Sequence, residues 1–171
     1  PIRADGPEGH LLTKQGTPTM GGVLILLALL TGTLLWADLT NAYVWILLFV
    51  TLGFGAIGFM DDYLKVRRQH SDGVPGRIKL VLEIAIALAA TFWIVSISAP
   101  PLENGLTLPF VKSIIIDLGW FFIPFATLVM VGASNAVNLT DGLDGLAIVP
   151  IMIAAACFGA ISYFVGNSVF S

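Results

Sequence analysis

Five long apolar runs divide this 171-residue chain and restrict the folds open to it. Hydrophobic residues make up 57% of the sequence and charged residues 11%, whereas a soluble domain carries about 25% charged residues. The runs occupy approximately residues 21–36, 44–60, 80–98, 120–137 and 146–165. Their lengths suit membrane-crossing helices, and they lack the alternation of membrane β-strands. The sequence therefore predicts an all-α, polytopic transmembrane helical bundle, with residues 1–171 forming one integral-membrane domain.

The basic residues predict the orientation of the chain. Most of them precede the first run or lie between the second and third runs: Arg3, Lys14, Lys65, Arg67, Arg68, Arg77 and Lys79. Because cytoplasmic loops are enriched in Lys and Arg, we expect the connections at about 1–20, 61–79 and 138–145 to face the cytoplasm. On the opposite side, the Pro100–Lys112 stretch could hold a short hairpin. Nothing in the charge pattern indicates a nucleic-acid partner.

Two adjacent carboxylates, Asp61 and Asp62, stand at the end of the second apolar run. The C-terminal end of a helix is already electronegative, so it is an unfavourable place for two acids. Ionisable groups at a membrane boundary usually have a partner and a function. Lys65 can pair with Asp61 at i, i+4, which leaves Asp62 unexplained. We expect a cation as the partner of the pair, and carboxylate oxygens suit Mg²⁺.

A glycine-rich polar segment, residues 14–22, precedes the first apolar run. One interpretation is a loop in which Thr19 caps the first helix. The other is an anion or ligand site, because glycines allow close backbone approach, a helix N-terminus offers free N–H groups and Lys14 adds charge. The glycines are not followed by Lys-Ser or Lys-Thr, so the segment is not a Walker A loop. The residue types leave both interpretations open.

A third polar segment connects the fourth and fifth runs. Asn135 and Asn138 lie one helical turn apart, and Asp141 and Asp144 each precede a glycine. Asn and Asp before Gly are typical of turns, so a tight link between two helices is one interpretation. This density of polar residues exceeds what a turn requires. It favours a site whose amides recognise a base or sugar and whose carboxylates accept hydrogen bonds or face a metal.

Together the three segments closely resemble the MraY family of phospho-N-acetylmuramoyl-pentapeptide transferases, which belongs to the polyprenyl-phosphate sugar-1-phosphate transferase superfamily. The resemblance runs from the first residue to Asn167. The Asp-Asp pair at 61–62 is shared across the superfamily. The stretches GTPTMGG at Gly16–Gly22 and NLTDGLDGL at Asn138–Leu146 are more specific to this branch.

The resemblance implies Mg²⁺-dependent transfer of phospho-N-acetylmuramoyl-pentapeptide from its UDP carrier to undecaprenyl phosphate, which gives lipid I and UMP for peptidoglycan synthesis. It implies a multi-pass protein of the bacterial inner membrane with its active site facing the cytoplasm, and it allows a homodimer. The implied catalytic residues are Asp61 and Asp62, and the implied metal ligands are Asp61, Asp62 and Asp141. The implied substrate-binding residues are Lys14, Thr19, Lys65, Arg77, Asn135, Asn138, Asp141, Gly142, Leu143 and Asp144.

The family also uses a third catalytic Asp and a His cluster in later cytoplasmic loops, which this sequence lacks. We therefore expect an internal fragment of a protein with about ten spans of bilayer length, and we expect the fragment alone to be inactive. One alternative is a sister transferase that passes N-acetylglucosamine-1-phosphate to the same lipid, although the 14–22 segment argues against it. The other is a cation-coupled transporter, although transporters place such charges near the membrane midplane.

Overall fold

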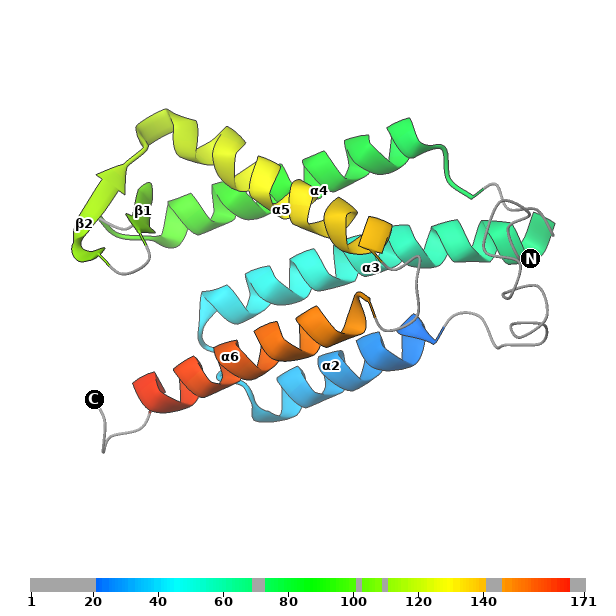
Figure 1. Ribbon diagram of the computed structural model, residues 1–171, viewed down its shortest axis with the longest axis horizontal. Helices are drawn as coiled ribbons and strands as arrows, with labels where there is room; N and C mark the ends of the chain where they lie inside the picture. The colour runs from blue at the N-terminus through cyan, green and yellow to red at the C-terminus, as the bar shows by residue number, and fades with distance from the viewer. Residues whose placement is uncertain (1–20, 69–72, 101–102, 109–110, 141–145, 167–171) are drawn as a thin grey trace. The chain divides into compact units, whose positions relative to one another are not determined.

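The computed structural model describes residues 21–68, 73–100, 103–108, 111–140 and 146–166. Helices dominate these residues (Figure 1). In chain order the elements are α2 (Gly22–Trp36), α3 (Ala42–Arg68), α4 (Gly76–Ile97), β1 (Gly105–Leu108), β2 (Val111–Asp117), the 3-10 turn η1 (Gly119–Phe121), α5 (Phe122–Thr140) and α6 (Ile148–Gly166). The chain divides into two compact units, Pro1–Leu128 and Val129–Ser171. The predicted helical fold class is confirmed.

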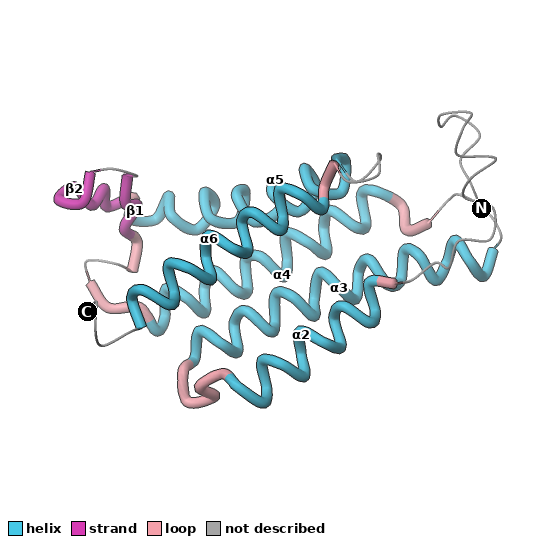
Figure 2. The backbone as a smooth tube through the Cα atoms, turned by 60° about the horizontal axis from the view of Figure 1, so that its bottom comes forward, coloured by secondary structure: helices cyan, strands magenta, loops and turns pink. Residues whose placement is uncertain are grey.

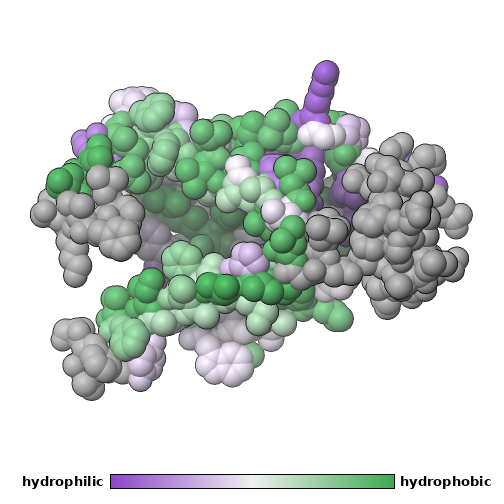
Figure 3. Space-filling model, viewed as in Figure 1, coloured by the Kyte–Doolittle hydropathy of each residue, from purple (hydrophilic) through white to green (hydrophobic). Residues whose placement is uncertain are grey.

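Four segments are long and apolar enough to cross a membrane: α3, α4, α5 together with η1, and α6. The α2 helix is apolar but has only 15 residues. At 1.5 Å per residue it spans about 22 Å, less than the roughly 30 Å hydrocarbon core. Hydrophobic side chains cover most of the described surface seen in Figure 3. The protein is a multi-pass membrane protein, and four of its five predicted spans have full length.

The central helix of the first unit is α3, because both α2 and α4 pack against it (Figure 2). A glycine of α3 lies at each of these two contacts. A Cβ added at Gly53 would lie 3.0 Å from Cδ1 of Ile86 in α4, and one added at Gly55 would lie 2.7 Å from Cδ1 of Leu26 in α2. Small residues allow membrane helices to approach closely, which is a main source of their packing energy.

The buried face of α4 follows the helical repeat. Its members are Glu83, Ala87, Ala90 and Thr91. The Thr91 hydroxyl donates a hydrogen bond to the Ala87 carbonyl at 2.8 Å, so this polar group is satisfied without leaving its own helix. Glu83, only 2% exposed, is the one acid among these four residues, and the other three are small. This face brings α4 close to α3.

At the end of the first unit away from Asp61 and Asp62, the start of α3 meets the end of α4. The Tyr43 hydroxyl lies 3.0 Å from Oγ of Ser98. The connection from α2 to α3 is a tight turn in which Asp38 accepts hydrogen bonds from the hydroxyl and the N–H of Thr40, at 2.6 and 3.0 Å. These bonds, chiefly the one from the hydroxyl, lower the pKa of the exposed Asp38 carboxyl.

Between α4 and α5, β1 and β2 form an antiparallel ribbon. Leu106 pairs with Ile116, and Thr107 pairs with Ile115. The short hairpin considered for Pro100–Lys112 is therefore present, although its second strand continues to Asp117.

Three helices, α3, α4 and α5, extend beyond the predicted spans into polar sequence. The α3 helix continues to Arg68, so Asp61 and Asp62 lie inside it, and the prediction that they end it is wrong. The last turn holds the basic residues Lys65, Arg67 and Arg68, as the helix dipole favours. The α4 helix begins at Gly76 and α5 continues to Thr140, so the predicted loops at 61–79 and 138–145 are shorter than expected.

Replacing Gly55 with Leu should push α2 away from α3, because even a Cβ there lies 2.7 Å from Leu26. Overpacking of this kind typically costs about 1–3 kcal/mol. Thermal unfolding in detergent should therefore show a lower midpoint for Gly55→Leu than for the unchanged protein. Gly32→Leu is the matched control, because a Cβ at Gly32 of α2 meets nothing within 4 Å. Equal midpoints for the two variants would contradict the close contact.

Candidate active site at the α2–α3 cavity

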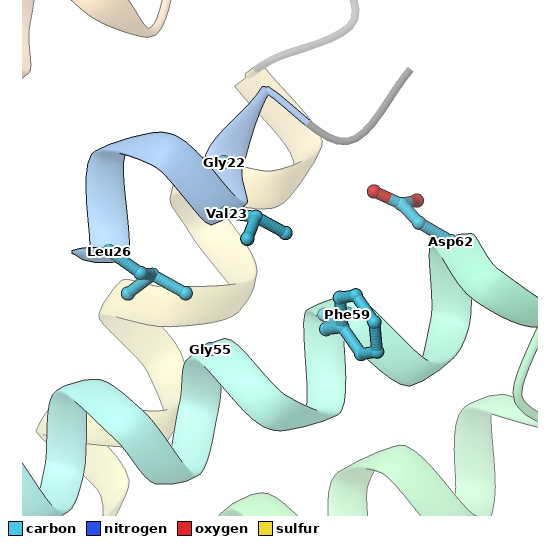
Figure 4. A pocket seen from close by; sticks show the side chains of 7 residues that line it. Gly22, Val23, Leu26, Gly55, Phe59 and Asp62 are labelled. Carbon is cyan, nitrogen blue, oxygen red and sulfur yellow. The ribbon is translucent and has the colours of Figure 1, made fainter.

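A cavity of about 300 Å³ lies between the first turns of α2 and the second half of α3. Its lining residues are Gly22, Val23 and Leu26 from α2, and Gly55, Gly58, Phe59 and Asp62 from α3. The α3 members recur every three or four residues, so they share one face of the helix. Figure 4 shows the Asp62 carboxylate at the end of this face, near the first turn of α2. The cavity is thus apolar along most of its length and acidic at one end.

The first turn of α2 contributes backbone rather than side-chain polarity to this end. Its N-cap residue is Gly21, which has no side chain to contribute. Thr19, interpreted from the sequence as the cap of the first helix, lies outside the described residues. The first N–H groups of a helix have no partner within the helix, so the Gly22 end of the cavity is electropositive, while Asp62 is negative.

The two adjacent acids have different surroundings. Asp61 accepts a hydrogen bond from Nζ of Lys65 at 2.5 Å and one from the Val74 N–H at 2.8 Å, and its side chain is 16% exposed. The Asp62 side chain is 54% exposed, and its Oδ1 lies 3.8 Å from Nζ of Lys65. Consecutive helical residues point about 100° apart. Asp61 therefore binds the segment that leads into α4, whereas Asp62 lines the cavity beside α2.

Gly73 allows the chain before α4 to reach Asp61. A Cβ at this position would overlap the Asp61 carboxylate, so a larger residue requires the segment to move. The ammonium of Lys79, in the first turn of α4, adds a favourable electrostatic interaction with Asp61. Sequence reasoning missed Gly73 and Val74 as site residues. The signals were present, since Asp72-Gly73 and Pro75-Gly76 are turn-forming pairs before a helix.

The predicted i, i+4 pair of Asp61 and Lys65 is confirmed. Arg77 is exposed near the beginning of α4. Asn135 and Asn138 lie near the end of α5, in the second unit. The Asn135 side chain donates a hydrogen bond to the carbonyl of Val131 at 2.9 Å. The predicted site residues outside the described part of the chain are Lys14, Thr19, Asp141, Gly142, Leu143 and Asp144.

The acidic pair fits a magnesium ion as a partial site. Within the described ranges, no three side chains of the His, Cys, Asp and Glu types form a group that could hold a metal. Mg²⁺ does not need such a cage, because it keeps several waters and is commonly held by one or two carboxylates together with substrate phosphates. Asp62 is the more exposed of the two acids, and Asp61 is adjacent to it.

One sequence-family model and one family signature match segments that meet at this cavity. The sequence model of glycosyl transferase family 4 matches residues 44–171, which include α3 and both acids. The chain belongs to glycosyl transferase family 4. In addition, phospho-N-acetylmuramoyl-pentapeptide-transferase signature 1 matches residues 14–26. The described end of that signature includes Gly22, Val23 and Leu26, which line the cavity opposite α3. Family membership and signature together make the protein a sugar-1-phosphate transferase that acts on a polyprenyl phosphate.

Gly73→Ala should break the link between Asp61 and α4, because the added methyl group occupies the space of the carboxylate. The part-buried Val74 amide then loses its acceptor, which costs less than the roughly 1–3 kcal/mol of a fully buried donor because water can reach it. Hydrogen exchange of the Val74 amide should become faster, and the thermal midpoint should fall. Gly76→Ala is the control, since a Cβ at Gly76 meets nothing within 4 Å. Unchanged exchange in Gly73→Ala would contradict the assignment.

Proposed function

We propose that the protein transfers phospho-N-acetylmuramoyl-pentapeptide from its UDP carrier to undecaprenyl phosphate at the cytoplasmic face of the bacterial inner membrane. In the overall reaction a P–O bond forms between the lipid phosphate and the sugar-bearing phosphorus. The bond from that phosphorus to UMP breaks, and the products are lipid I and UMP. The observation that carries this proposal is that residues of the signature segment and Asp62 line the same cavity.

The position of the cavity suits two substrates of opposite solubility. Its apolar walls continue along α2 and α3, while Asp62 lies within two turns of the basic end of α3. A lipid acceptor and a water-soluble nucleotide donor can meet only where hydrocarbon gives way to water. The basic residues after Asp62 support a cytoplasmic orientation for this end.

In this proposal the two acids have different roles. Phosphoryl transfer depends chiefly on positioning and on neutralising charge. Asp62, exposed in the cavity, acts directly on the reacting groups. Asp61 holds Lys65 in place through their 2.5 Å contact, and Lys65 faces the diphosphate. Both acids remain catalytic candidates, since they share Lys65.

Mg²⁺ completes the proposed site. Asp62, Asp61 and Asp141 would hold the ion, which supplies neutralisation of the diphosphate charge when bound. The nucleotide and sugar would be bound by the remaining predicted residues: Lys14, Thr19, Arg77, Asn135, Asn138, Gly142, Leu143 and Asp144.

Asp62→Asn should lower the rate of UMP release by about 100-fold or more, because the amide neither accepts a proton from the lipid phosphate nor carries the charge that would hold Mg²⁺. Asp61→Asn should lower both the rate and the thermal midpoint, because Lys65 loses its ionic partner. The matched control is Asp38→Asn, at the opposite end of the first unit, which should retain full activity. The assay uses the intact purified protein in detergent with Mg²⁺. Full turnover by Asp62→Asn would contradict the role proposed for Asp62, and absence of UMP release by the unchanged protein would favour a cation-coupled transporter.

Donor choice distinguishes this reaction from that of the sister transferase. Intact protein is offered UDP-N-acetylmuramoyl-pentapeptide and UDP-N-acetylglucosamine in competition, with undecaprenyl phosphate as the acceptor. We expect lipid product from the muramoyl-pentapeptide donor alone. Lipid-linked N-acetylglucosamine as the main product would assign the protein to the sister reaction.

A further inference from the structure

The β1–β2 ribbon exposes apolar side chains on both of its faces. Side chains alternate between the faces of a strand, so Ile115 points to one face, while Ile114 and Ile116 point to the other. Paired residues share a face, which places Leu106 beside Ile116 and Thr107 beside Ile115. All three isoleucines are exposed, and Ile114 is 49% exposed. A two-stranded ribbon with this surface is at best marginally stable in water.

The faces of the ribbon are apolar and favour a non-aqueous environment, whereas its edges are polar and need hydrogen-bond partners. In the described part of the chain the sheet has two strands, so each strand has one edge without a neighbouring strand. The outward N–H and C=O groups along these edges need water or another donor or acceptor. Open edges do not occur in the hydrocarbon core, where each unsatisfied group costs several kcal/mol. Deep burial in lipid is therefore excluded for the ribbon, although its faces are apolar.

Exposed aromatic residues lie next to the ribbon and elsewhere at the same end of the first unit. Gly119, with φ +49°, turns the chain after β2, and its N–H donates a hydrogen bond to Asp117 at 2.8 Å. Trp120 follows directly and is 90% exposed. Exposed Trp and Tyr residues at the same end of the first unit, where Tyr43 meets Ser98, include Trp36, Tyr43 and Trp45. Trp and Tyr are enriched where hydrocarbon meets the polar headgroups.

We propose that the β1–β2 ribbon is a lipid-binding element that lies in the headgroup zone of the bilayer, at the end of the first unit away from Asp61 and Asp62. Its isoleucines contact the upper acyl chains, and its open edges contact water and headgroups. In the chain the ribbon lies between α4 and the α5 segment, both of which are long and apolar enough to cross a membrane. A bilayer interface meets both requirements at once, because it is apolar on one side and hydrated on the other.

Spin labels on the two faces of the ribbon test this placement. Single cysteines replace Ile115 and Ile116 in the intact protein, after Cys157 and any other cysteine are changed to Ala. The labelled protein is reconstituted in phospholipid vesicles, and collision rates are measured with oxygen, which is concentrated in lipid, and with a water-soluble nickel chelate. Arg68→Cys, exposed at the last residue of α3 and beyond its apolar part, is the water control. Leu128→Cys, 70% exposed near the middle of α5, is the hydrocarbon control.

We expect both ribbon labels to collide with oxygen more often than the Arg68 label. Their nickel collision rates should be several-fold below that of the Arg68 label and above that of the Leu128 label. Nickel rates equal to the Arg68 control at both positions would overturn the proposal in favour of a ribbon in water. Labels protected from both reagents would overturn it in favour of cover by a protein, either a second copy or another partner.

A second measurement does not depend on the cysteine variants. Trp120 fluorescence is obtained as the difference between the unchanged protein and Trp120→Phe in vesicles whose lipids carry bromine either near the headgroup or near the chain end. Headgroup-proximal bromine should quench Trp120 more strongly than chain-end bromine. Absence of quenching by either lipid would place Trp120 outside the bilayer and contradict the proposal.

Discussion

The hydrogen bond from the Val74 amide to Asp61 connects α3 to the beginning of α4, and the arrangement of the acidic site depends on it. With Lys65 as its second partner, Asp61 is directed towards the α4 side. The next residue points about 100° away, so Asp62 is directed into the cavity beside α2. Two chemically identical neighbours thereby acquire different surroundings, one bonded and largely buried, the other exposed.

Glycine residues, which have no side chain, set both the spacing of the helices around the cavity and its volume. Gly55 allows Leu26 of α2 to approach α3 closely, which fixes the separation of the two helices at that level. Towards Asp62, Gly22 and Gly58 leave space that larger residues would fill. The small residues that membrane helices use for packing therefore also create the volume that borders the acid.

The membrane constrains the two ends of the first unit in different ways. At one end α3 continues beyond its apolar part and finishes in basic residues, a composition suited to water and to anionic headgroups. At the other end aromatic residues and an apolar ribbon follow the helices. The bilayer thus has a polar, charged boundary at the acidic site and an amphipathic boundary at the ribbon. The transfer chemistry needs the first kind of boundary, because charged substrates must reach it from water.

Much of the fold could be predicted, because hydrocarbon requires each spanning segment to satisfy its own backbone hydrogen bonds. The apolar runs located the five α-helices of the described residues, and the i, i+4 spacing located the pair of Asp61 and Lys65. The helix ends were less predictable. Hydropathy indicates where a segment leaves the hydrocarbon core, but a helix can continue further. Lys and Arg are good helix formers, so α3 continues beyond its apolar part to Arg68.

The sequence by itself determined a helical membrane protein with an acidic pair beside basic residues, since composition and periodicity act locally along the chain. Only the tertiary structure decided which acid lines a cavity. That outcome depends on the side from which α2 and α4 approach α3, and on the fit of Gly73 against Asp61. No local pattern within α3 contains this information, because its partners come from segments on either side of it in the chain.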